Sequence, residues 1–342
     1  MRKTPLISVI IPVHNGSKHL NDCLDALMRS SYSKYEIIVV DDCSTDDSVE
    51  ISERKGAKVY KLSHQSGPAA ARNYGARMAK GKIIVFIDAD VIVQYETIER
   101  VTDDFRKNPN VVAIFGSYDD SPAAEDFLSQ FKNLLHHFIH QNSEENAKTF
   151  WAGFGAIYRE VFLQLNGFDE KRYTKPSIED IELGLRICNA GYQIRLDKDL
   201  QVKHAKQWSW CALLRTDILN RALPWSKLII EKGALSSDLN LKVDYRISSF
   251  LAGIILLLLI LTILDVVGII GIGLNKYFIA LAVFLVIAIM LLNLDLYNFF
   301  FHKRGLKFTF LSVPLHFFYY LYSGITFIIC WIIHKLYLLR ST

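Results

Sequence analysis

Two aspartates, Asp88 and Asp90, close an apolar run in the segment "IIVFIDADVIV", residues 83 to 93. The run is typical of a buried strand, where an unpaired carboxylate is costly. We therefore expect both carboxylates at the end of the strand, facing a polar cleft or holding a cation. Strand alternation, with a turn that begins between the two residues, lets two short carboxylates converge on one divalent ion.

Polar residues also end two earlier apolar runs. The segment "ISVIIPVHN", 7 to 15, ends in His14 and Asn15, and "YEIIVVDDCSTDDS" breaks at Asp41 and Asp42. An acidic pair after a single strand is as often a helix cap or a turn. Ligands of parallel sheets, however, bind beyond the carboxyl ends of the strands. Three strands that end in polar residues together predict a ligand-binding cleft.

Helical patterns separate these strands. Leu20, Leu24, Leu27 and Met28 recur at helical spacing, and "GPAAARNYGARMAKG", 67 to 81, predicts another helix. The alternation predicts an α/β fold with right-handed crossovers and a mainly parallel sheet. The sequence has no Gly-x-x-x-x-Gly-Lys phosphate loop, and no Gly-x-Gly-x-x-Gly follows the first strand. This argues against P-loop enzymes and dinucleotide-dependent oxidoreductases.

Two further segments contain titratable clusters. "SIEDIELG" holds Glu179, Asp180 and Glu182 before a predicted helix. In one interpretation these acids only cap that helix, since negative charge in a first turn is favourable by roughly 0.3–1 kcal/mol. "LLHHFIH" places His136 and His140 at metal-ligand spacing, but it lacks the glutamate of a zinc-protease helix. We do not expect a metal site at this histidine pair.

The composition changes near residue 247. The 342-residue chain has a net charge of +4, which the basic residues near its apolar segments explain better than nucleic-acid binding does. Three later stretches each supply the roughly 20 apolar residues that a helix needs to cross a bilayer. They are 247 to 274, 277 to 301 and 308 to 334. We therefore divide the chain into an α/β domain, interfacial amphipathic helices with a linker, and a transmembrane helical domain, at 1–206, 207–246 and 247–342.

The segment "WSWCALLRTDILNRALPWSKLIIEK", 208 to 232, combines apolar residues with Arg215, Arg221 and Lys227. This pattern suits a helix in the membrane interface, and the alternative is an ordinary helix packed on the α/β domain. No N-terminal signal sequence is visible, so we expect a cytosolic α/β domain. The basic loop "HKRGLK", 302 to 307, agrees with a return to the cytosolic side of the membrane.

Polar residues interrupt the apolar stretches. Asp265 lies in the first stretch, and Asn293 and Asp295 lie late in the second. Residues near helix ends commonly reach the interface, and a function within the membrane is the alternative. The third stretch contains Pro314 and either spans the membrane or is re-entrant. The five cysteines lack the paired spacing of a zinc site or disulfide framework, so we expect free thiols in a reducing compartment.

The segments "SVIIPVHN", "IIVVDDCSTDDS", "AARNYGA" and "FIDAD" stand in this order within residues 8 to 90. In order and spacing they resemble the family 2 glycosyltransferases of GT-A fold. The likeness continues to "PSIEDIELGLRICNAGYQI", 176 to 194, and so covers the whole α/β part. The resemblance implies a Rossmann-like, mainly parallel GT-A sheet and a nucleotide-sugar donor bound with a divalent cation, Mg²⁺ or Mn²⁺.

The resemblance also implies roles for the donor-side residues. Arg72 would lie near the diphosphate, and Asp88 and Asp90 would bind the metal with that diphosphate, Asp90 as the direct ligand. His204, in "LQVKHAK", would add a further group near the metal, although an isolated histidine is more often structural. The residues that would border the base and ribose are Pro12, Val13, Asn15, Asp41 and Asp42.

On the acceptor side, the resemblance implies that Asp180 is the general base and that Glu179 supports it and contacts the acceptor. The sugar would be transferred with inversion. The segment "TFWAGFGAIYREVF", 149 to 162, resembles the part of the family that closes over sugar and acceptor. Trp151 would form a face against a sugar ring, and Gly153 would permit close backbone approach; a simple turn is the alternative for the glycine.

We therefore expect a membrane-anchored inverting glycosyltransferase of the cell membrane, with no nucleic-acid partner. It would move one sugar from a UDP- or GDP-linked donor to a hydroxyl of a lipid or lipid-linked saccharide, for glycolipid or cell-envelope glycan synthesis. "QWSW" lacks the Arg of the Gln-x-x-Arg-Trp motif of processive polysaccharide synthases, which argues against processive synthesis. The alternatives are a polyprenyl-phosphate sugar synthase, whose ionised acceptor hardly needs Asp180, and a non-catalytic nucleotide-binding membrane scaffold.

Overall fold

The computed structural model describes residues 5–233, 242–270 and 273–341. Parts of the expected linker and of the first apolar stretch, 234–241 and 271–272, lie outside the described residues. The chain divides into two units, Met1–Leu213 and Leu214–Thr342.

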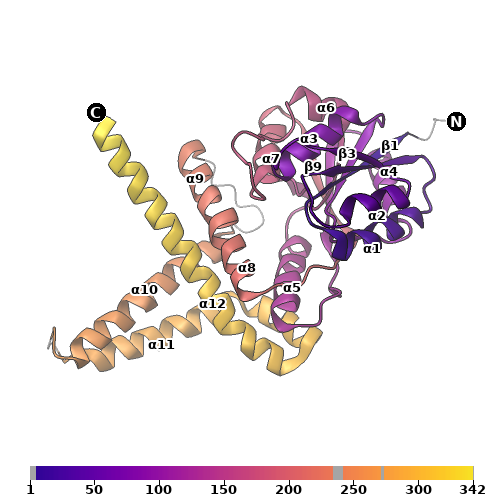
Figure 1. Cartoon of the computed structure of the whole chain (residues 1–342). Coiled ribbons are helices and arrows are strands. Elements are labelled where there is room, and N and C mark those ends of the chain that lie inside the picture. The colour runs from indigo at the N-terminus through magenta and orange to yellow at the C-terminus, as the bar shows by residue number, and fades with distance from the viewer. Residues whose placement is uncertain (1–4, 234–241, 271–272, 342) are drawn as a thin grey trace. The chain divides into compact units, whose positions relative to one another are not determined.

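The first unit is built on a mixed sheet with helices on both of its faces (Figure 1). Its strands lie in the order β3-β2-β1-β4-β8-β6-β9-β5, and β7 pairs with β9. The strands are β1 (Ile7–Val13), β2 (Tyr35–Asp41), β3 (Lys58–Lys61), β4 (Ile83–Ile87), β5 (Val91–Ile92), β6 (Val111–Tyr118), β7 (Asn146–Ala147), β8 (Phe154–Tyr158) and β9 (Gln193–His204).

The predicted parallel arrangement is confirmed around the first strand. β1 is parallel to both β2 and β4, β2 is parallel to β3, and β6 is parallel to β9. β8 lies antiparallel between β4 and β6. The register pairs Val13 with Asp41 at the ends of β1 and β2. The carboxyl ends of β1, β2 and β4 therefore lie at one edge of the sheet, as the polar strand endings predicted.

Amphipathic helices connect these strands. In α1, the helical repeat of the sequence buries Leu20, Cys23, Leu24 and Leu27, and β4 between the helical layers is buried throughout. The helices of this unit are α1 (Ser17–Met28), α2 (Ser48–Arg54), α3 (Pro68–Met78), α4 (Thr97–Lys107), α5 (Phe127–Gln141), α6 (Arg159–Gln164) and α7 (Glu179–Asn189). α8 (Trp210–Arg215) begins at the end of this unit and runs to the next.

The second unit is helical in its described residues. Three of its helices are long and apolar enough to cross a membrane, although their bounds differ from the sequence-based ones. The helices are η1 (Thr216–Ala222, π-helical), α9 (Leu223–Lys232), α10 (Val243–Val266), α11 (Asn275–Leu292) and α12 (Leu294–Ser341). The predicted break near residues 302 to 307 is present as a non-helical Gly305 inside α12.

Two polar residues of the apolar stretches make defined contacts. The Asp265 carboxylate accepts hydrogen bonds from the backbone N–H groups of Gly273 and Asn275, both at 2.9 Å. These bonds link the end of α10 to the start of α11. Asn293 is buried, donates to Ser248 at 3.1 Å and accepts from Tyr320 at 2.6 Å. The Asn293 amide thus joins helices of this unit, and its position at the membrane interface stays a prediction.

The amphipathic segment 208 to 232 is helical from Trp210 onward, as predicted. It buries Leu213, Leu228 and Ile229 and leaves its basic side chains Arg215, Arg221 and Lys227 exposed. α9 packs against α12, which belongs to the same unit. Its placement in a membrane interface stays a prediction.

Candidate active site

Asp88 and Asp90 follow β4 directly, and backbone contacts fix them beyond the strand end. β4 ends at Ile87, and the Asp88 N–H donates to the carbonyl of Gly153 at 3.1 Å. The Val91 N–H then donates to the Asp88 carbonyl at 3.0 Å, which forms the turn. Both side chains are partly exposed at this edge. The apolar run thus ends before its carboxylates, as the cost of burying them requires.

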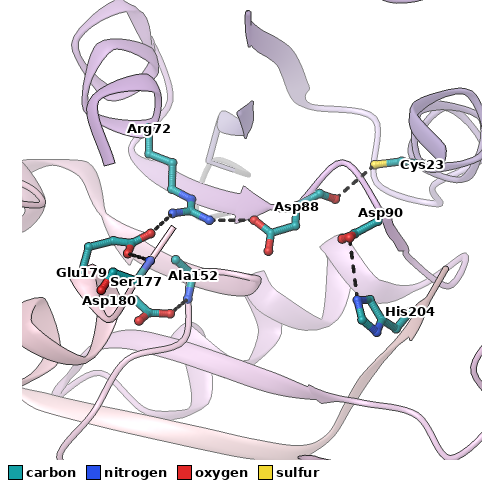
Figure 2. Close-up of polar contacts among 9 residues, drawn as sticks. All are labelled: Cys23, Arg72, Asp88, Asp90, Ala152, Ser177, Glu179, Asp180 and His204. Atoms are coloured by element: carbon teal, nitrogen blue, oxygen red, sulfur yellow. Dashed lines mark hydrogen bonds and ion pairs between the residues drawn. The ribbon is translucent and has the colours of Figure 1, made fainter. Parts of the chain in front are cut away.

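Arg72 joins the acids that are predicted for the donor side to those that are predicted for the acceptor side (Figure 2). One guanidinium nitrogen donates to Asp88 Oδ1 at 2.7 Å, and the other donates to Glu179 Oε1 at 2.8 Å. The Arg72 side chain is only 5% exposed. A buried charge is tolerated when it is paired and hydrogen-bonded, and the planar guanidinium fork suits two carboxylates at once. The segments "AARN", "DAD" and "SIED" therefore meet in one cluster.

His204 is brought to Asp90 by strand pairing. β5 and β9 are antiparallel and pair Val91 with His204, while the Ala205 N–H donates to the Asp90 carbonyl at 2.8 Å. His204 Nε2 consequently lies 3.8 Å from Asp90 Oδ2 (Figure 2). On its ring face His204 stacks on Tyr118, with ring centroids 4.1 Å apart and planes at 15°.

The two aspartates have opposite pKa shifts although they are neighbours. Burial raises the pKa of Asp88, against the opposing influence of Arg72. Burial also acts to raise the pKa of Asp90, but His204 and then Lys206 outweigh it and bring that pKa to about 2. Asp90 is therefore held ionised at any physiological pH, which is the state that a cation ligand needs.

Glu179 and Asp180 begin α7, and the protein engages them differently. Glu179 is buried, and its second oxygen accepts the Ser177 N–H at 2.9 Å in addition to the Arg72 contact. Asp180 is half-buried and accepts the Ala152 N–H at 3.0 Å and the Ile181 N–H at 2.8 Å. Each oxygen of both carboxylates thus accepts one hydrogen bond, and the two acids differ in exposure: Glu179 is buried, whereas Asp180 retains partial access to solvent.

The pKa of Asp180 is raised to about 6, first by burial and second by the adjacent Glu179 charge, while the Ala152 N–H and Arg72 oppose the rise. A carboxylate with this pKa is ionised at pH 7 and is more basic than an ordinary aspartate. This is the property that a general base for a neutral hydroxyl requires.

The residues expected at the nucleotide lie at the ends of β1 and β2. Asp41 and Asp42 are each 4% exposed, and the Asp42 carboxylate accepts the N–H groups of Ser66 and Gly67 at 2.6 and 2.8 Å. Asp41 accepts the Ser44 N–H at 3.1 Å. Both acids therefore hold loops in place; their contact with a base or ribose stays a prediction.

The remaining expected nucleotide residues differ in exposure. Asn15 has a left-handed φ of 52°, is exposed, and accepts the Thr45 N–H at 2.8 Å through its side chain. Pro12 and Val13 precede it at the end of β1, half-buried and buried. The structure therefore brings the predicted residues to one edge of the sheet, with Asn15 the one most open to a ligand.

Trp151 lies over Gly153, next to Asp88. A Cβ on Gly153 would lie 2.6 Å from the Trp151 ring, so a larger residue here would displace the indole. The indole is half-buried and packs against Tyr118 and His136, with ring centroids 4.8 Å away in each case. Trp151 thus belongs to an aromatic cluster that also supports His204 through Tyr118. Its contact with a sugar stays a prediction.

Sequence reasoning missed two features of this site. Nothing in the sequence marked Tyr118, which ends β6 and stacks on His204. Lys206 was also missed, although its position two residues after His204 and its influence on Asp90 place it near the acids. Lys206 Nζ lies 4.3 Å from the centroid of the Trp208 ring.

The chemistry of the donor set fits a hard divalent cation. Asp88 and Asp90 offer carboxylate oxygens and His204 a ring nitrogen, although Asp88 already shares one oxygen with Arg72. Across residues 5–233, 242–270 and 273–341, no three His, Cys, Asp or Glu side chains converge to hold a metal ion by themselves. Mg²⁺ commonly takes only one or two protein carboxylates and completes its shell with substrate phosphates and water.

Comparison with known proteins assigns the first part of the chain. Residues 8–165 match the model of Glycosyl transferase family 2. The chain is 36% identical over 119 residues to an uncharacterized glycosyltransferase of Haemophilus influenzae, covering 33% of this chain and 47% of that protein. It is 35% identical over 123 residues to glycosyltransferase GlyG of Streptococcus pneumoniae, covering 34% and 41%. The chain thus matches less than half the length of each of these relatives.

Solved structures share the fold at lower identity. The mannosyltransferase PcManGT of Pyrobaculum calidifontis, in complex with GDP-Man and Mn²⁺, matches with a TM-score of 0.58 and 17% identity over 96% of this chain and 88% of that one. Staphylococcus aureus TarS 1–349 with UDP-GlcNAc matches with a TM-score of 0.50 and 20% identity over 66% of each chain. The chain therefore carries a family 2 glycosyltransferase domain of GT-A fold, followed by three long apolar helices.

Proposed function

We propose that this chain is a membrane-anchored, metal-dependent, inverting glycosyltransferase. It transfers one sugar from a nucleotide-sugar donor to a hydroxyl of a lipid or lipid-linked saccharide at the cytosolic face of the cell membrane. The observation that carries the proposal is the Arg72 bridge between Asp88 and Glu179. Through it, the acids of the donor side and the helix that begins with Glu179 and Asp180 share one cluster.

The donor chemistry rests on the strand-end acids. Asp88 and Asp90, with His204, would hold Mg²⁺ or Mn²⁺, and the ion would supply neutralisation of charge on the leaving diphosphate. Arg72 adds a fixed positive charge beside Asp88. The relatives PcManGT and TarS were solved with GDP-Man and UDP-GlcNAc respectively, which supports a UDP- or GDP-linked donor here.

The acceptor chemistry rests on Asp180. Its carboxylate accepts the proton of the acceptor hydroxyl while that oxygen attacks the anomeric carbon, and the nucleoside diphosphate leaves from the opposite face. The raised pKa of about 6 supports this role, because the group is ionised at pH 7 yet basic enough to take a proton as the new bond forms. Glu179, with both oxygens occupied, positions the start of α7.

The membrane anchoring, and with it a lipid acceptor, is supported by the three apolar helices of the second unit. Each is long enough to cross a bilayer, and a membrane-anchored transferase meets amphiphilic acceptors at the surface to which it is confined. The choice of sugar depends on contacts with the sugar itself, which neither helix length nor the acid cluster determines.

A transfer assay tests the proposal. The full chain in detergent or nanodiscs is incubated with Mn²⁺ or Mg²⁺, a panel of radiolabelled nucleotide sugars and a total lipid extract, beside Asp90→Ala. A lipid-extractable product that disappears in the variant and on chelation is the expected result. If the protein neither hydrolyses any nucleotide sugar of the panel nor transfers a sugar from it, the result would favour the non-catalytic scaffold.

A second variant separates the two kinds of acceptor. Asp180→Asn should lower turnover by about 10²–10⁴-fold if the acceptor is a hydroxyl that needs a base. Glu160→Gln, an exposed acid on α6, is the matched control and should retain activity. Near-full turnover in Asp180→Asn would instead favour the polyprenyl-phosphate sugar synthase, whose acceptor is already ionised.

A further inference from the structure

The long helix α12 contains a sharp corner. Gly305 has φ 78° and ψ −179°, a backbone conformation that is essentially restricted to glycine, so the element is two helices that meet at this residue. The two arms fold against each other, since the rings of Phe300 and Phe308 lie 5.5 Å apart and the Tyr297 hydroxyl lies 3.2 Å from His316 Nδ1.

Basic side chains gather around this corner. His302, Lys303 and Arg304 end the first arm, Lys307 begins the second, and all four are exposed. The sequence contains no Asp or Glu from residue 296 to residue 342. Basic residues in the last turn of a helix also favour its C-terminal dipole, but that effect accounts for the first arm alone and not for Lys307.

Large apolar side chains lie between the basic ones and are exposed as well. Phe301 is 49% exposed, Leu306 is 72% exposed and Phe310 is 76% exposed. Scattered apolar residues on a surface need no explanation, but here three occur within ten residues that also hold four basic groups. Apolar side chains that enter the acyl boundary, flanked by Lys and Arg at the level of lipid phosphates, are the pattern of a membrane-surface contact.

We propose that the Gly305 corner, residues 301–310, is a binding surface for the anionic headgroups of bilayer lipids. Positive charge on both arms is complementary to phosphate-bearing headgroups, and the exposed Phe301, Leu306 and Phe310 enter the adjacent hydrocarbon. The corner contributes no residue to the proposed donor or acceptor sites, so this role goes beyond the proposed transfer reaction and does not depend on it.

The test measures which lipids stay with the protein. The full chain is reconstituted into vesicles of equal amounts of phosphatidylglycerol and phosphatidylcholine and extracted in a mild non-ionic detergent, and the retained lipids are quantified by mass spectrometry. Wild type should retain phosphatidylglycerol preferentially, and less so as ionic strength rises. A basic residue near an anionic surface is worth roughly a fivefold change in binding. Lys303→Gln/Arg304→Gln/Lys307→Gln should therefore lower the preference by on the order of tenfold or more.

A matched control removes the same charge elsewhere. Lys80, Lys107 and Lys171 are exposed side chains of the first unit, and their triple replacement by Gln should retain the wild-type preference. Circular dichroism verifies that both variants keep their helices. An unchanged preference in the corner variant, an equal loss in the control variant, or equal retention of both lipids by wild type would each overturn the proposal. None of these readouts involves sugar transfer, so failure here leaves the proposed function intact.

Discussion

The guanidinium of Arg72 donates to the carboxylate of Glu179 at 2.8 Å, across 107 positions of the sequence. Both side chains are only 5% exposed, so this is a buried ion pair. The second nitrogen of the same guanidinium reaches Asp88, which makes the position of the acceptor-side helix dependent on the donor-side strand end. In the proposed enzyme, a change at Arg72 therefore alters both halves of the site.

Removal of Arg72 should destabilise the protein as well as abolish transfer. Arg72→Ala leaves the buried Glu179 charge uncompensated, and breaking such a pair from one side costs about 3–5 kcal/mol of unfolding free energy. Denaturant unfolding of the first unit, followed in the full chain, measures this loss. Arg77→Ala, an exposed arginine on the same helix, should change stability by less than about 0.5 kcal/mol. Equal stability of the two variants would refute the pairing argument.

A second substitution should partly reverse the effect. Glu179→Gln added to Arg72→Ala removes the stranded negative charge, so the double variant should be less destabilised than the sum of the two single variants. Transfer activity should not recover with it, because Arg72 is then still absent beside Asp88. Strict additivity in this cycle would mean that the two groups do not interact.

The rate of transfer should fall at acid pH through the protonation of Asp180. Its pKa is raised to about 6, so the carboxylate that we propose as the general base is present above this pH and lost as the pH drops through it. A profile of kcat/KM against pH, at saturating metal, should have an acid limb near pH 6, since this parameter reports the free enzyme. Glu179→Gln removes the neighbouring charge that raises the pKa, so the limb should move to lower pH. A limb that stays in place or moves upward in that variant would assign it to another group.

The strand-end part of the site could be predicted from sequence because it is local. Each of β1, β2 and β4 is an apolar run broken by a polar residue, and parallel pairing alone then brings Asn15, Asp42 and Asp88 to one edge. The acids of α7 were likewise visible as a cluster before a helical repeat. Their catalytic roles remain predictions, because burial and hydrogen bonds show where a group lies and not what it binds.

Other contacts could not be predicted because they join segments far apart in the chain. The approach of His204 to Asp90 depends on the two-residue strand β5, which has no periodicity of its own. The two hydrogen bonds of Arg72, to Asp88 and Glu179, correspond to no pattern in the spacing of residues along the sequence. The basic loop 302 to 307 predicted a break between the second and third apolar stretches, yet only the backbone conformation of Gly305 reveals a corner inside α12.

Loss of the Tyr118 ring should weaken the binding of the metal ion that transfer is proposed to need. Tyr118 stacks on His204, the residue beside Asp90, so the ring fixes the orientation of a proposed metal-site group. Residues that orient metal ligands typically contribute about 10–100-fold in metal affinity or activity. Tyr118→Ala should therefore raise the Mn²⁺ concentration for half-maximal transfer by about that factor, while Tyr118→Phe, which keeps the ring, should stay near wild type. An equal Mn²⁺ requirement in all three proteins would contradict this positioning role.

Gly184→Ala should displace the helix that carries Asp180. A Cβ at this position would lie 2.4 Å from the Phe150 nitrogen and 2.6 Å from the Thr149 Cα, and backbone atoms cannot move away cheaply. Overpacking of this kind costs about 1–3 kcal/mol of stability. It would also push α7 away from the loop whose Ala152 N–H donates to Asp180. Transfer and thermal stability should both fall. Gly253→Ala, with no atom within 4 Å of the added carbon, is the control and should leave both unchanged.

Asn293 should stabilise the helical unit through its two side-chain contacts. Asn293→Ala removes the hydrogen bonds to Ser248 and Tyr320. These bonds connect the residue between α11 and α12 to α10 on one side and to α12 on the other. Hydrogen bonds between membrane helices contribute about 0.6 kcal/mol each on average and up to about 1.7, so the loss should be about 1–3 kcal/mol. Titration of the full chain with sodium dodecyl sulfate in mixed micelles measures it. Asn298→Ala, at an exposed position of α12, should titrate like wild type. Coincident curves for the two variants would mean that the buried amide leaves helix association unaffected.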